Sequence, residues 1–375
     1  MKFQAIIVAL VSAISVSMAA PLPQSKSVPA KENSGGRVVL DGAQCSPVQG
    51  RLVCDDGFGN TFLGDADEFT GLALDVNAFG DGAVLGCDFA GEVFETHPSA
   101  TKFRKGSRIA GFVWGGEIPG LGAYSTYTIA DERLSFEIPD NIGSAEASSI
   151  PLAATTAWLA LFSPDCLGLA KHQDAKKTPL LIWGGSSVVG HFAIQLAKMY
   201  GYEVVTTCSP RNFNQAKLSG ASHVFDYNDE HVTEKIRASV PELKYAFDTI
   251  GNRTSSATAA TALQGQAGHL CTVRPGKANT ENVPSTVHVS DVFVFTAFPT
   301  AHTYRGKAHW PINMPNHEMS VEFHNQIPGL LSEGNLKPPA IDVLGNLSPE
   351  VIEEAMNINR DGKISGQKVV FTGFE

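Results

Sequence analysis

Charged side chains are scarce in this sequence, and basic ones are scarcer than acidic ones. Only 18% of the 375 residues are charged, and 28 lysines and arginines against 38 aspartates and glutamates leave a formal net charge of −10. Without a basic excess the chain has no cationic stripe for a phosphate backbone, which argues against non-specific nucleic-acid binding. The hydrophobic share of 43% argues equally against intrinsic disorder.

Cysteine is also rare, and the chain has no Cys-x-x-Cys pair and no Cys/His pair at ligand spacing. The six cysteines are Cys45, Cys54, Cys87, Cys166, Cys208 and Cys271. Such scattered positions exclude a disulfide scaffold and argue against a structural zinc site. Cys45 and Cys54 would pair in a small loop in a secreted chain, and would be ordinary thiols in the cytosol.

Long hydrophobic runs are missing as well, apart from a shorter one at the start. Nothing approaches the ~18 consecutive apolar residues of a membrane span, so no span is expected. Residues 1–20 place Lys2 before an apolar run and end in small residues before Pro21, which is the layout of a secretory signal peptide. The alternative is an N-terminal helix of an intracellular protein. Residues 21–69, rich in Pro, Ser, Gly and Lys, predict a linker.

The strongest positive signal lies between residues 179 and 207. An apolar run over 179–183 predicts a strand buried on both faces, the Gly-Gly-Ser-Ser turn at 184–187 follows, and helical spacing then leads to a second apolar strand over 202–207. In such a βαβ unit the glycines let backbone N–H groups at a helix N-terminus approach a pyrophosphate. Taken alone, the turn fits tight strand–helix packing equally well.

The end of the second strand indicates which dinucleotide is bound. An acidic residue there would bond the ribose 2′-hydroxyl of NADH, but the chain has Ser209, Pro210, Arg211 and Asn212. A hydroxyl, an amide and the guanidinium fork of Arg211 suit a 2′-phosphate, so we expect NADPH. The alternative for Arg211 is a solvated loop cation.

Further segments continue this doubly wound α/β pattern. Helices are predicted over 213–218 and 232–240, and strands over 220–227, 245–251, 268–273 and 292–298. The sheet then has about six strands. Ligands of such sheets bind at the carboxyl ends of the strands, so Ser209, Tyr227, Gly251 and Val273 should lie near one crevice.

Several stretches together carry a family resemblance. They are residues 85–91 (LGCDFAG), 103–111, 122–127, 150–158, 184–187, 209–212 (SPRN), 225–227 (FDY) and 362–370. With them the chain resembles the medium-chain dehydrogenase/reductase superfamily and, within it, the fungal trans-acting enoyl reductases that assist polyketide synthases.

The resemblance implies two domains. A GroES-like β-barrel catalytic domain would span 70–155, with 300–375 returning to it, and a Rossmann NADP-binding domain would span 156–299. The barrel is expected to be incomplete at its N-terminus, because its first strands have no counterpart over residues 56–82. Either the leader has taken over some of their packing or the enzyme is compromised.

Zinc is not expected. Zinc alcohol dehydrogenases have Gly-His-Glu where this chain has Gly86, Cys87 and Asp88, and the run of four closely spaced cysteines is absent. Without a metal to polarise a carbonyl, reduction of an activated C=C bond is favoured over alcohol oxidation. NADPH would deliver hydride to the β-carbon of an enoyl thioester or enone, and a proton would add at the α-carbon.

The resemblance also implies site residues, although no catalytic residue or proton donor stands out. The implied cofactor contacts are Ser186, Ser187, Val188 and Val189 at the diphosphate, Ser209, Pro210, Arg211 and Asn212 at the 2′-phosphate, Tyr227 at the adenosine, and Ile364 and Ser365 at the nicotinamide-side cleft. The implied substrate contacts are Thr155, Thr156, Phe295, Thr296, Ala297, Phe298 and Pro299. For Phe295 and Phe298, core packing is an equal alternative.

Three functions follow from these residues. The first is a trans-acting, NADPH-dependent enoyl reductase whose acyl-thioester substrate is held by a polyketide synthase carrier protein. The others are a freestanding quinone or enone reductase of small molecules, and a non-catalytic relic that binds nucleotide. The cofactor favours a cytoplasmic location and the leader a secreted one, in which a glycan on the Asn252-Arg253-Thr254 sequon would interfere with the cofactor site.

Overall fold

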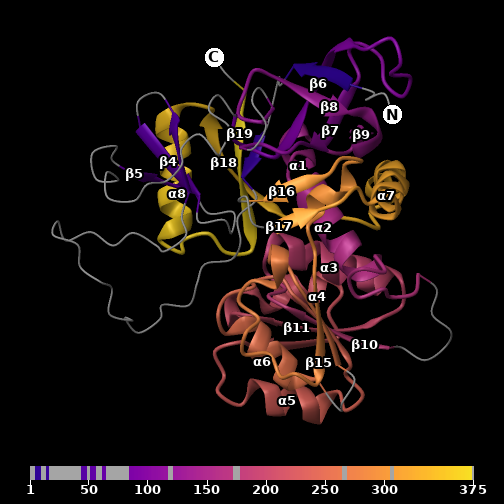
Figure 1. Cartoon of the computed structure of the whole chain (residues 1–375), viewed down its shortest axis with the longest axis vertical. Helices are drawn as coiled ribbons and strands as arrows, with labels where there is room; N and C mark the ends of the chain where they lie inside the picture. Colours follow the sequence, from indigo (N-terminus) through magenta and orange to yellow (C-terminus); the bar gives the residue numbers. More distant parts are fainter. Residues whose placement is uncertain are drawn as a thin grey trace.

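The computed structural model describes residues 84–116, 121–171, 178–263, 268–304 and 308–373, together with five strands nearer the N-terminus. Those five strands are β1 (Ala5–Ala9), β2 (Ile14–Val16), β3 (Gln44–Val48), β4 (Arg51–Asp55) and β5 (Thr61–Gly64). The chain builds one body around a largely antiparallel sheet and a second around a parallel sheet, with α2 at their junction (Figure 1).

The parallel sheet has six strands in the order β12-β11-β10-β13-β14-β15. The strands are β10 (Pro179–Trp183), β11 (Glu203–Cys208), β12 (His223–Asp226), β13 (Tyr245–Asp248), β14 (Gly268–Thr272) and β15 (Val287–Asp291). The helices between them are α3 (Val188–Met199), α4 (Phe213–Ser219), α5 (Val232–Ser239) and α6 (Ser255–Ala262). The predicted Rossmann architecture is confirmed.

The strand predicted over 292–298 is wrong. The sixth strand is β15, and the residues after it form the short 3₁₀ helix η6 (Val294–Ala297). The phenylalanines of this apolar run pack into a cluster of aromatic rings rather than into the sheet, with Phe293 4.2 Å from Trp310 between ring centroids. A short apolar run signals burial, and its periodicity alone does not distinguish a strand from other buried backbone.

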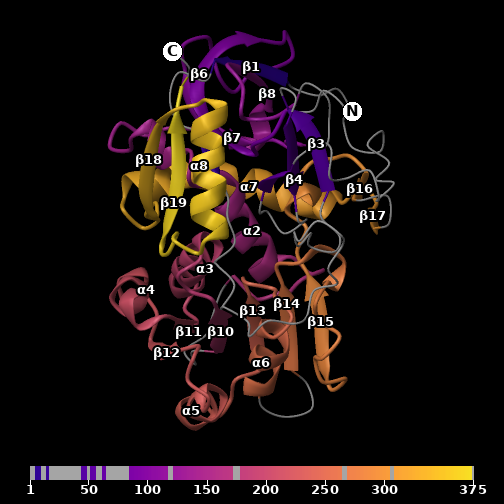
Figure 2. The same cartoon turned by 90° about the vertical axis from the view of Figure 1, so that its left-hand side faces the viewer.

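The other body is built on an eight-stranded sheet ordered β18-β19-β2-β6-β1-β8, with β7 joining β6 to β9. Its remaining strands are β6 (Asp88–Thr96), β7 (Arg108–Phe112), β8 (Tyr127–Asp131), β9 (Ser135–Glu137), β18 (Ala340–Asn346) and β19 (Gln367–Thr372). The last two come from the C-terminal end of the chain, and helix α8 (Pro349–Arg360) lies beside them (Figure 2). The C-terminal segment therefore returns to the first domain, as the fold class predicts.

Part of the apolar leader takes strand positions in this sheet. Strand β1 pairs with both β6 and β8, with Ile7 opposite Ile129, and β2 pairs with β6 and β19. Within the segment predicted to be a linker, β3, β4 and β5 form a small antiparallel sheet in which Cys45 lies opposite Cys54. The predicted loss of barrel strands over 56–82 falls mostly outside the described residues.

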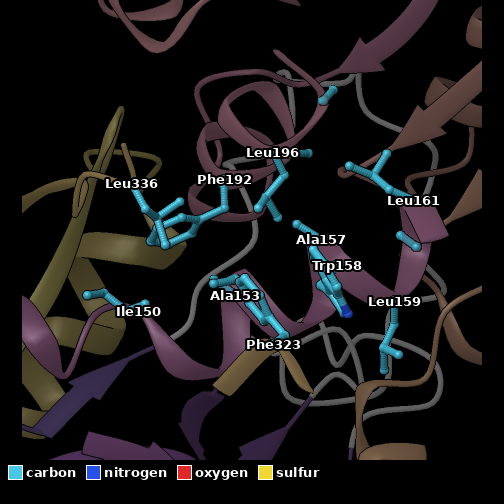
Figure 3. Packing of buried hydrophobic residues seen from close by; sticks show 14 of the residues in the cluster. Ile150, Ala153, Ala157, Trp158, Leu159, Leu161, Phe192, Leu196, Phe323 and Leu336 are labelled. Atoms are coloured by element: carbon cyan, nitrogen blue, oxygen red, sulfur yellow. The ribbon is translucent and has the colours of Figure 1, made fainter. Parts of the chain in front are cut away.

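Helix α2 (Pro151–Phe162) joins the two bodies through the largest hydrophobic core. Eleven of its twelve residues are buried, and Trp158 stacks on Phe323 of α7 (Met314–Ser332) with ring centroids 4.6 Å apart. Figure 3 shows these two rings beside Ala153 and Ala157, with Phe192 and Leu196 of α3 facing them. Small alanines on α2 let both neighbouring helices approach it closely, which fixes the junction.

The remaining elements are short. They are α1 (Ser144–Ala147), η3 (Glu132–Leu134), η4 (Pro210–Asn212), η5 (Pro275–Lys277), β16 (His302–Tyr304) and β17 (Ala308–Trp310). Within the described ranges, none of the helices combines the length and apolar character that crossing a membrane requires.

Candidate functional site

A pocket opens at the carboxyl ends of β10, β11 and β13, where the strand order reverses and open α/β sheets bind their ligands. Its lining residues are Trp183, Gly184, Ser186, Ser187, Val188, Thr207, Cys208, Ser209, Arg211, Tyr227, Asn228, Ile250, Asn252, Thr254, Ser255, Thr258, Ile364, Ser365, Gly366 and Gln367. Both bodies of the chain contribute to this wall.

The turn into α3 presents its backbone to the pocket. Ser187 is the N-cap of α3, and its hydroxyl accepts a hydrogen bond from the Gly190 N–H at 2.9 Å. Gly184 has a φ of +89°, and a Cβ on Gly190 would lie 2.3 Å from the Gly184 carbonyl oxygen. A side chain at Gly190 would therefore push the helix away from the turn. The remaining N–H groups of the first helical turn are a suitable cradle for an anion.

A cation lines the same pocket as this cradle. Arg211, on η4 directly after β11, is the charged residue among the described residues that line the pocket. Ser209 and Tyr227 lie on the same wall, at the ends of β11 and β12. Because none of the described residues lining it is a carboxylate, this end of the pocket suits a phosphate better than the two hydroxyls of an unmodified ribose.

Asn212 stands behind this wall rather than in it. Its side chain is 7% exposed, and its amide donates hydrogen bonds to the Ser365 hydroxyl at 2.9 Å and the Ser209 hydroxyl at 3.3 Å. Of the predicted 2′-phosphate residues, the structure therefore brings Ser209 and Arg211 to the pocket and gives Asn212 a supporting position. Pro210 does not line the pocket.

The loop after β13 supplies a further wall that sequence reasoning largely missed. Ile250, Asn252 and Ser255 line the pocket, whereas Gly251, which was expected at the crevice, does not; Asn252 was expected there only as a glycan site. Asp248, fully buried at the end of β13, accepts hydrogen bonds from two backbone N–H groups and from two serine hydroxyls, the latter both at 2.7 Å. The rule that ligands bind at strand ends located this loop through Gly251, but it did not identify which of the loop's side chains line the pocket.

The loop and the α3 turn are linked by Thr249. Its hydroxyl lies 2.8 Å from that of Ser187 and donates to the carbonyl oxygens at the end of β10. Beside them, burial raises the pKa of the Cys208 thiol to about 12, with a contribution from Asp226. Cys208 is thus a neutral thiol. Because nucleophilic chemistry needs a thiolate, Cys208 lines the pocket without acting as a nucleophile.

The predicted substrate residues on α2 lie in the core. Thr155 is fully buried, and its hydroxyl donates to the Pro151 carbonyl at 2.6 Å and lies 3.0 Å from Nε2 of His324. Burial, with Lys102 nearby, lowers the pKa of His324 to about 3, so the imidazole is neutral and its Nε2–H donates to Thr155. The Thr156 hydroxyl donates to the Leu152 carbonyl at 2.7 Å. Neither threonine lines the pocket.

The predicted substrate residues on η6 belong to an aromatic cluster between η6 and the end of β7. Phe295 stacks on Trp114 with ring centroids 4.9 Å apart, and Phe298 meets Phe112 edge-on at 5.1 Å. Phe295, Phe298 and Pro299 are partly exposed, whereas Thr296 and Ala297 are buried. None of the five lines the pocket. Core packing therefore accounts for Thr296 and Ala297. Phe295, Phe298 and Pro299 form a partly exposed apolar surface.

A buried ion pair joins the C-terminal strand β19 to β6 beside α2. Lys368 of β19 and Asp88 of β6 are both fully buried, with Nζ and Oδ2 2.5 Å apart, and Asp88 also accepts the Leu152 N–H at the start of α2. Sequence reasoning did not find this pair, whose members are 280 residues apart. The available signal was weak: Lys368 is the charge in the apolar β19, but β6 carries Glu92 and Glu95 as well as Asp88.

The structure thus gathers most of the predicted cofactor residues. Those lining the pocket are Ser186, Ser187, Val188, Ser209, Arg211, Tyr227, Ile364 and Ser365. Val189 follows in α3 and packs against the core. Over the described part of the chain, no three His, Cys, Asp or Glu side chains are grouped so as to hold a metal ion.

Two family models match the chain. The one described as the alcohol dehydrogenase GroES-like domain matches residues 63–140, and the one described as zinc-binding dehydrogenase matches residues 188–305. Among curated proteins, a trans-enoyl reductase of Gibberella fujikuroi is 34% identical over 299 residues, covering 77% of this chain and 83% of that protein. Trans-enoyl reductase fsa3 of a Fusarium species is 34% identical over 300 residues, with 78% and 84% covered.

Solved structures share the fold at lower identity. A putative zinc-dependent alcohol dehydrogenase from Rhizobium etli superposes with a TM-score of 0.65 at 23% identity, covering 99% of this chain and 90% of that one. The CurK enoyl reductase gives 0.61 at 18% identity, with 82% and 83% covered. The Escherichia coli quinone oxidoreductase complexed with NADPH gives 0.57 at 17% identity, with 77% and 82% covered.

Proposed function

Because the chain belongs to the trans-enoyl reductases of the medium-chain dehydrogenase/reductase superfamily, we propose that it is an NADPH-dependent enoyl reductase that acts in trans on a polyketide intermediate. The substrate class is an α,β-unsaturated thioester carried by a polyketide synthase carrier protein. The proposed domain limits are 70–155 with 300–375 for the catalytic domain and 156–299 for the nucleotide-binding domain.

The choice of NADPH rests on one observation. Arg211 is the charged side chain among the described pocket residues, and it stands where an NAD-binding site would place a carboxylate. The glycine turn at the start of α3 supports a diphosphate position, since the lack of a Cβ on Gly190 lets α3 begin close against the turn, with its N-terminal N–H groups at the pocket. The residues present therefore fit a dinucleotide with a phosphorylated ribose.

Each wall of the pocket has a part in the proposed reaction. Bound NADPH supplies the hydride for the β-carbon, while a proton from solvent completes the α-carbon. The α3 turn with Ser187 holds the diphosphate, the guanidinium of Arg211 holds the 2′-phosphate, and Tyr227 lies along the adenosine. Ile364 and Ser365 close the side formed by the first domain. Because Ser365 is hydrogen-bonded to Asn212, we place it at the 2′-phosphate end and not at the nicotinamide-side cleft that the resemblance implied. Outside this pocket, the partly exposed Phe295 and Phe298 would offer an apolar surface to the acyl chain.

The direct test compares two substrates. NADPH oxidation is followed spectrophotometrically with an enoyl thioester on a carrier protein and with a free small enone at the same concentration. We expect a higher kcat/KM for the carrier-bound substrate. Preference for the free enone would support a freestanding enone reductase instead, and a folded protein that fails to quench or enhance NADPH fluorescence would support a non-catalytic relic.

We also propose that the enzyme acts in the cytoplasm, where NADPH is available. The pairing of β1 with β6 and β8 supports this, because cleavage near residue 20 would remove strands β1 and β2 from the sheet. Mass spectrometry of the native N-terminus is the test. A mature chain that begins near Ala20 would contradict the proposal and favour secretion.

A further inference from the structure

The segment over residues 364–367 is tied across the pocket mouth to the nucleotide-binding domain. Gln215 of α4 donates a hydrogen bond from Nε2 to the Gly366 carbonyl at 2.7 Å, and Asn212 donates from Nδ2 to the Ser365 hydroxyl at 2.9 Å. The bonded residues are 151 and 153 positions apart in the chain. We call these four residues, Asn212, Gln215, Ser365 and Gly366, the clasp.

Gly366 allows this close approach and no other residue would. Its φ is +70°, a conformation that side chains with a Cβ rarely adopt. A Cβ at this position would lie 2.5 Å from Oε1 of Gln215 and 3.1 Å from Oδ1 of Asn212. A larger residue would therefore be strained by this φ and would displace the two clasp amides from their present positions.

The clasp is built around the end of the pocket where the cation lies. Asn212 follows Arg211 directly and also bonds Ser209, so one amide connects the phosphate-binding loop to the returning segment. Ser209, Arg211, Ser365 and Gly366 all line the same pocket, whereas Asn212 and Gln215 stand behind that wall. A ligand held by Ser209 and Arg211 would thus share the pocket with Ser365 and Gly366.

We propose that Asn212 and Gln215 are positioning residues that hold the returning segment closed over the 2′-phosphate end of NADPH, and that opening of this clasp sets the rate at which NADPH leaves. The proposal rests on the NADPH-dependent function proposed above. NADH lacks the 2′-phosphate and gains little from an ordered Ser209–Arg211 loop, so its release depends less on the clasp.

Stopped-flow displacement of bound NADPH and of bound NADH tests the clasp, with nucleotide fluorescence as the signal. Gln215→Ala removes one hydrogen bond, and Gly366→Ala strains the backbone and displaces the amide ends of Gln215 and Asn212. From the free energy that one or two hydrogen bonds contribute, we expect NADPH release to become about tenfold faster in each variant. The rate of NADH release should change less than about threefold.

Two control variants separate the clasp from general damage. Gly334 has a φ of +71° and open space around it, so Gly334→Ala reproduces the backbone strain of Gly366→Ala without the collision. Asn214 is the exposed neighbour of Gln215, so Asn214→Ala reproduces an amide loss on α4. Both controls should release NADPH at the wild-type rate. If Gly366→Ala does not fold, as judged by its thermal unfolding, Gln215→Ala decides alone.

The outcomes are distinct. Wild-type release rates in the clasp variants would overturn the clasp while leaving NADPH-dependent reduction intact. Equal acceleration of NADPH and NADH would also overturn it, because the segment would then be a general cover with no tie to the 2′-phosphate. A wild-type protein that binds NADH but not NADPH would overturn the proposed cofactor, and the clasp with it.

Discussion

Replacing Arg211 with alanine is the sharpest test of the cofactor site. Arg211 is the charged residue among the described residues lining the pocket, and no carboxylate lines it. A hydrogen bond to a charged group contributes about 1.5–3 kcal/mol, which corresponds to roughly ten- to 150-fold in Kd. Because the side chain is exposed and screened by solvent, we expect the lower end of this range, about tenfold weaker NADPH binding.

The assay is a fluorescence titration with NADPH and with NADH at low and high salt. In the wild type the preference for NADPH should shrink as salt rises, since an exposed charge pair is screened. Arg211→Ala should abolish most of that preference and leave the Kd for NADH within about twofold, because NADH has no phosphate for the guanidinium. The preference of Arg211→Lys for NADPH should lie between those of the wild type and Arg211→Ala, since lysine keeps the charge but lacks the bidentate guanidinium.

Lys217→Ala is the matched control, because Lys217 is an exposed cation on the adjacent helix that does not line the pocket. If Arg211→Ala weakened NADPH and NADH equally, the 2′-phosphate assignment would be refuted. The same conclusion would follow if Lys217→Ala changed the preference as much as Arg211→Ala.

Three further predictions concern the framework of the site. Gly190→Ala should raise the Kd for both nucleotides at least about tenfold in titrations, since its Cβ would collide with the Gly184 carbonyl, and unchanged affinity would contradict this cradle. Lys368→Met should lower the free energy of unfolding, measured by urea denaturation, by about 3–5 kcal/mol, because it leaves Asp88 buried without its lysine. A double variant, Asp88→Asn/Lys368→Met, that is equally unstable would argue against that cause. His324, with a pKa lowered to about 3 in the folded chain, takes up its proton only on unfolding below pH ~6.5, so stability should fall as pH drops from that value, by up to about 1.4 kcal/mol per unit. His324→Gln should flatten this decline in urea titrations at several pH values, and identical slopes would count against it.

Local patterns were enough to predict the nucleotide-binding half of the site. The apolar run of β10, the glycine turn and the first turn of α3 are contiguous, so both the βαβ unit and its ligand-facing backbone follow from about thirty residues. The same holds for Ser209 and Arg211, which come directly after β11. The end of a strand can be located from local sequence. Because ligands of open α/β sheets bind at the carboxyl ends of the strands, that location is enough to assign a residue to the site.

Contacts between distant parts of the chain were beyond such reasoning. The Asp88–Lys368 pair and the Asn212–Ser365 bond join segments that no periodicity connects. Residues 292–298 show the other failure, because their apolar character reports burial in an aromatic cluster and was interpreted as burial in a sheet. Likewise Thr155 was expected to face substrate, but both hydrogen-bonding roles of its hydroxyl are filled within the core.

The late position of β19 has a consequence for how the chain folds during synthesis. Strands β10 to β15 lie within one continuous stretch, so the parallel sheet can form as soon as that stretch has left the ribosome. The antiparallel sheet must wait for β19, and until then the Asp88 carboxylate has no lysine beside it and β2 and β18 lack the strand that joins them. Until β19 has emerged, the nascent chain therefore carries a finished nucleotide-binding fold and an open sheet edge at the same time. The chain is exposed to aggregation through that edge during this interval.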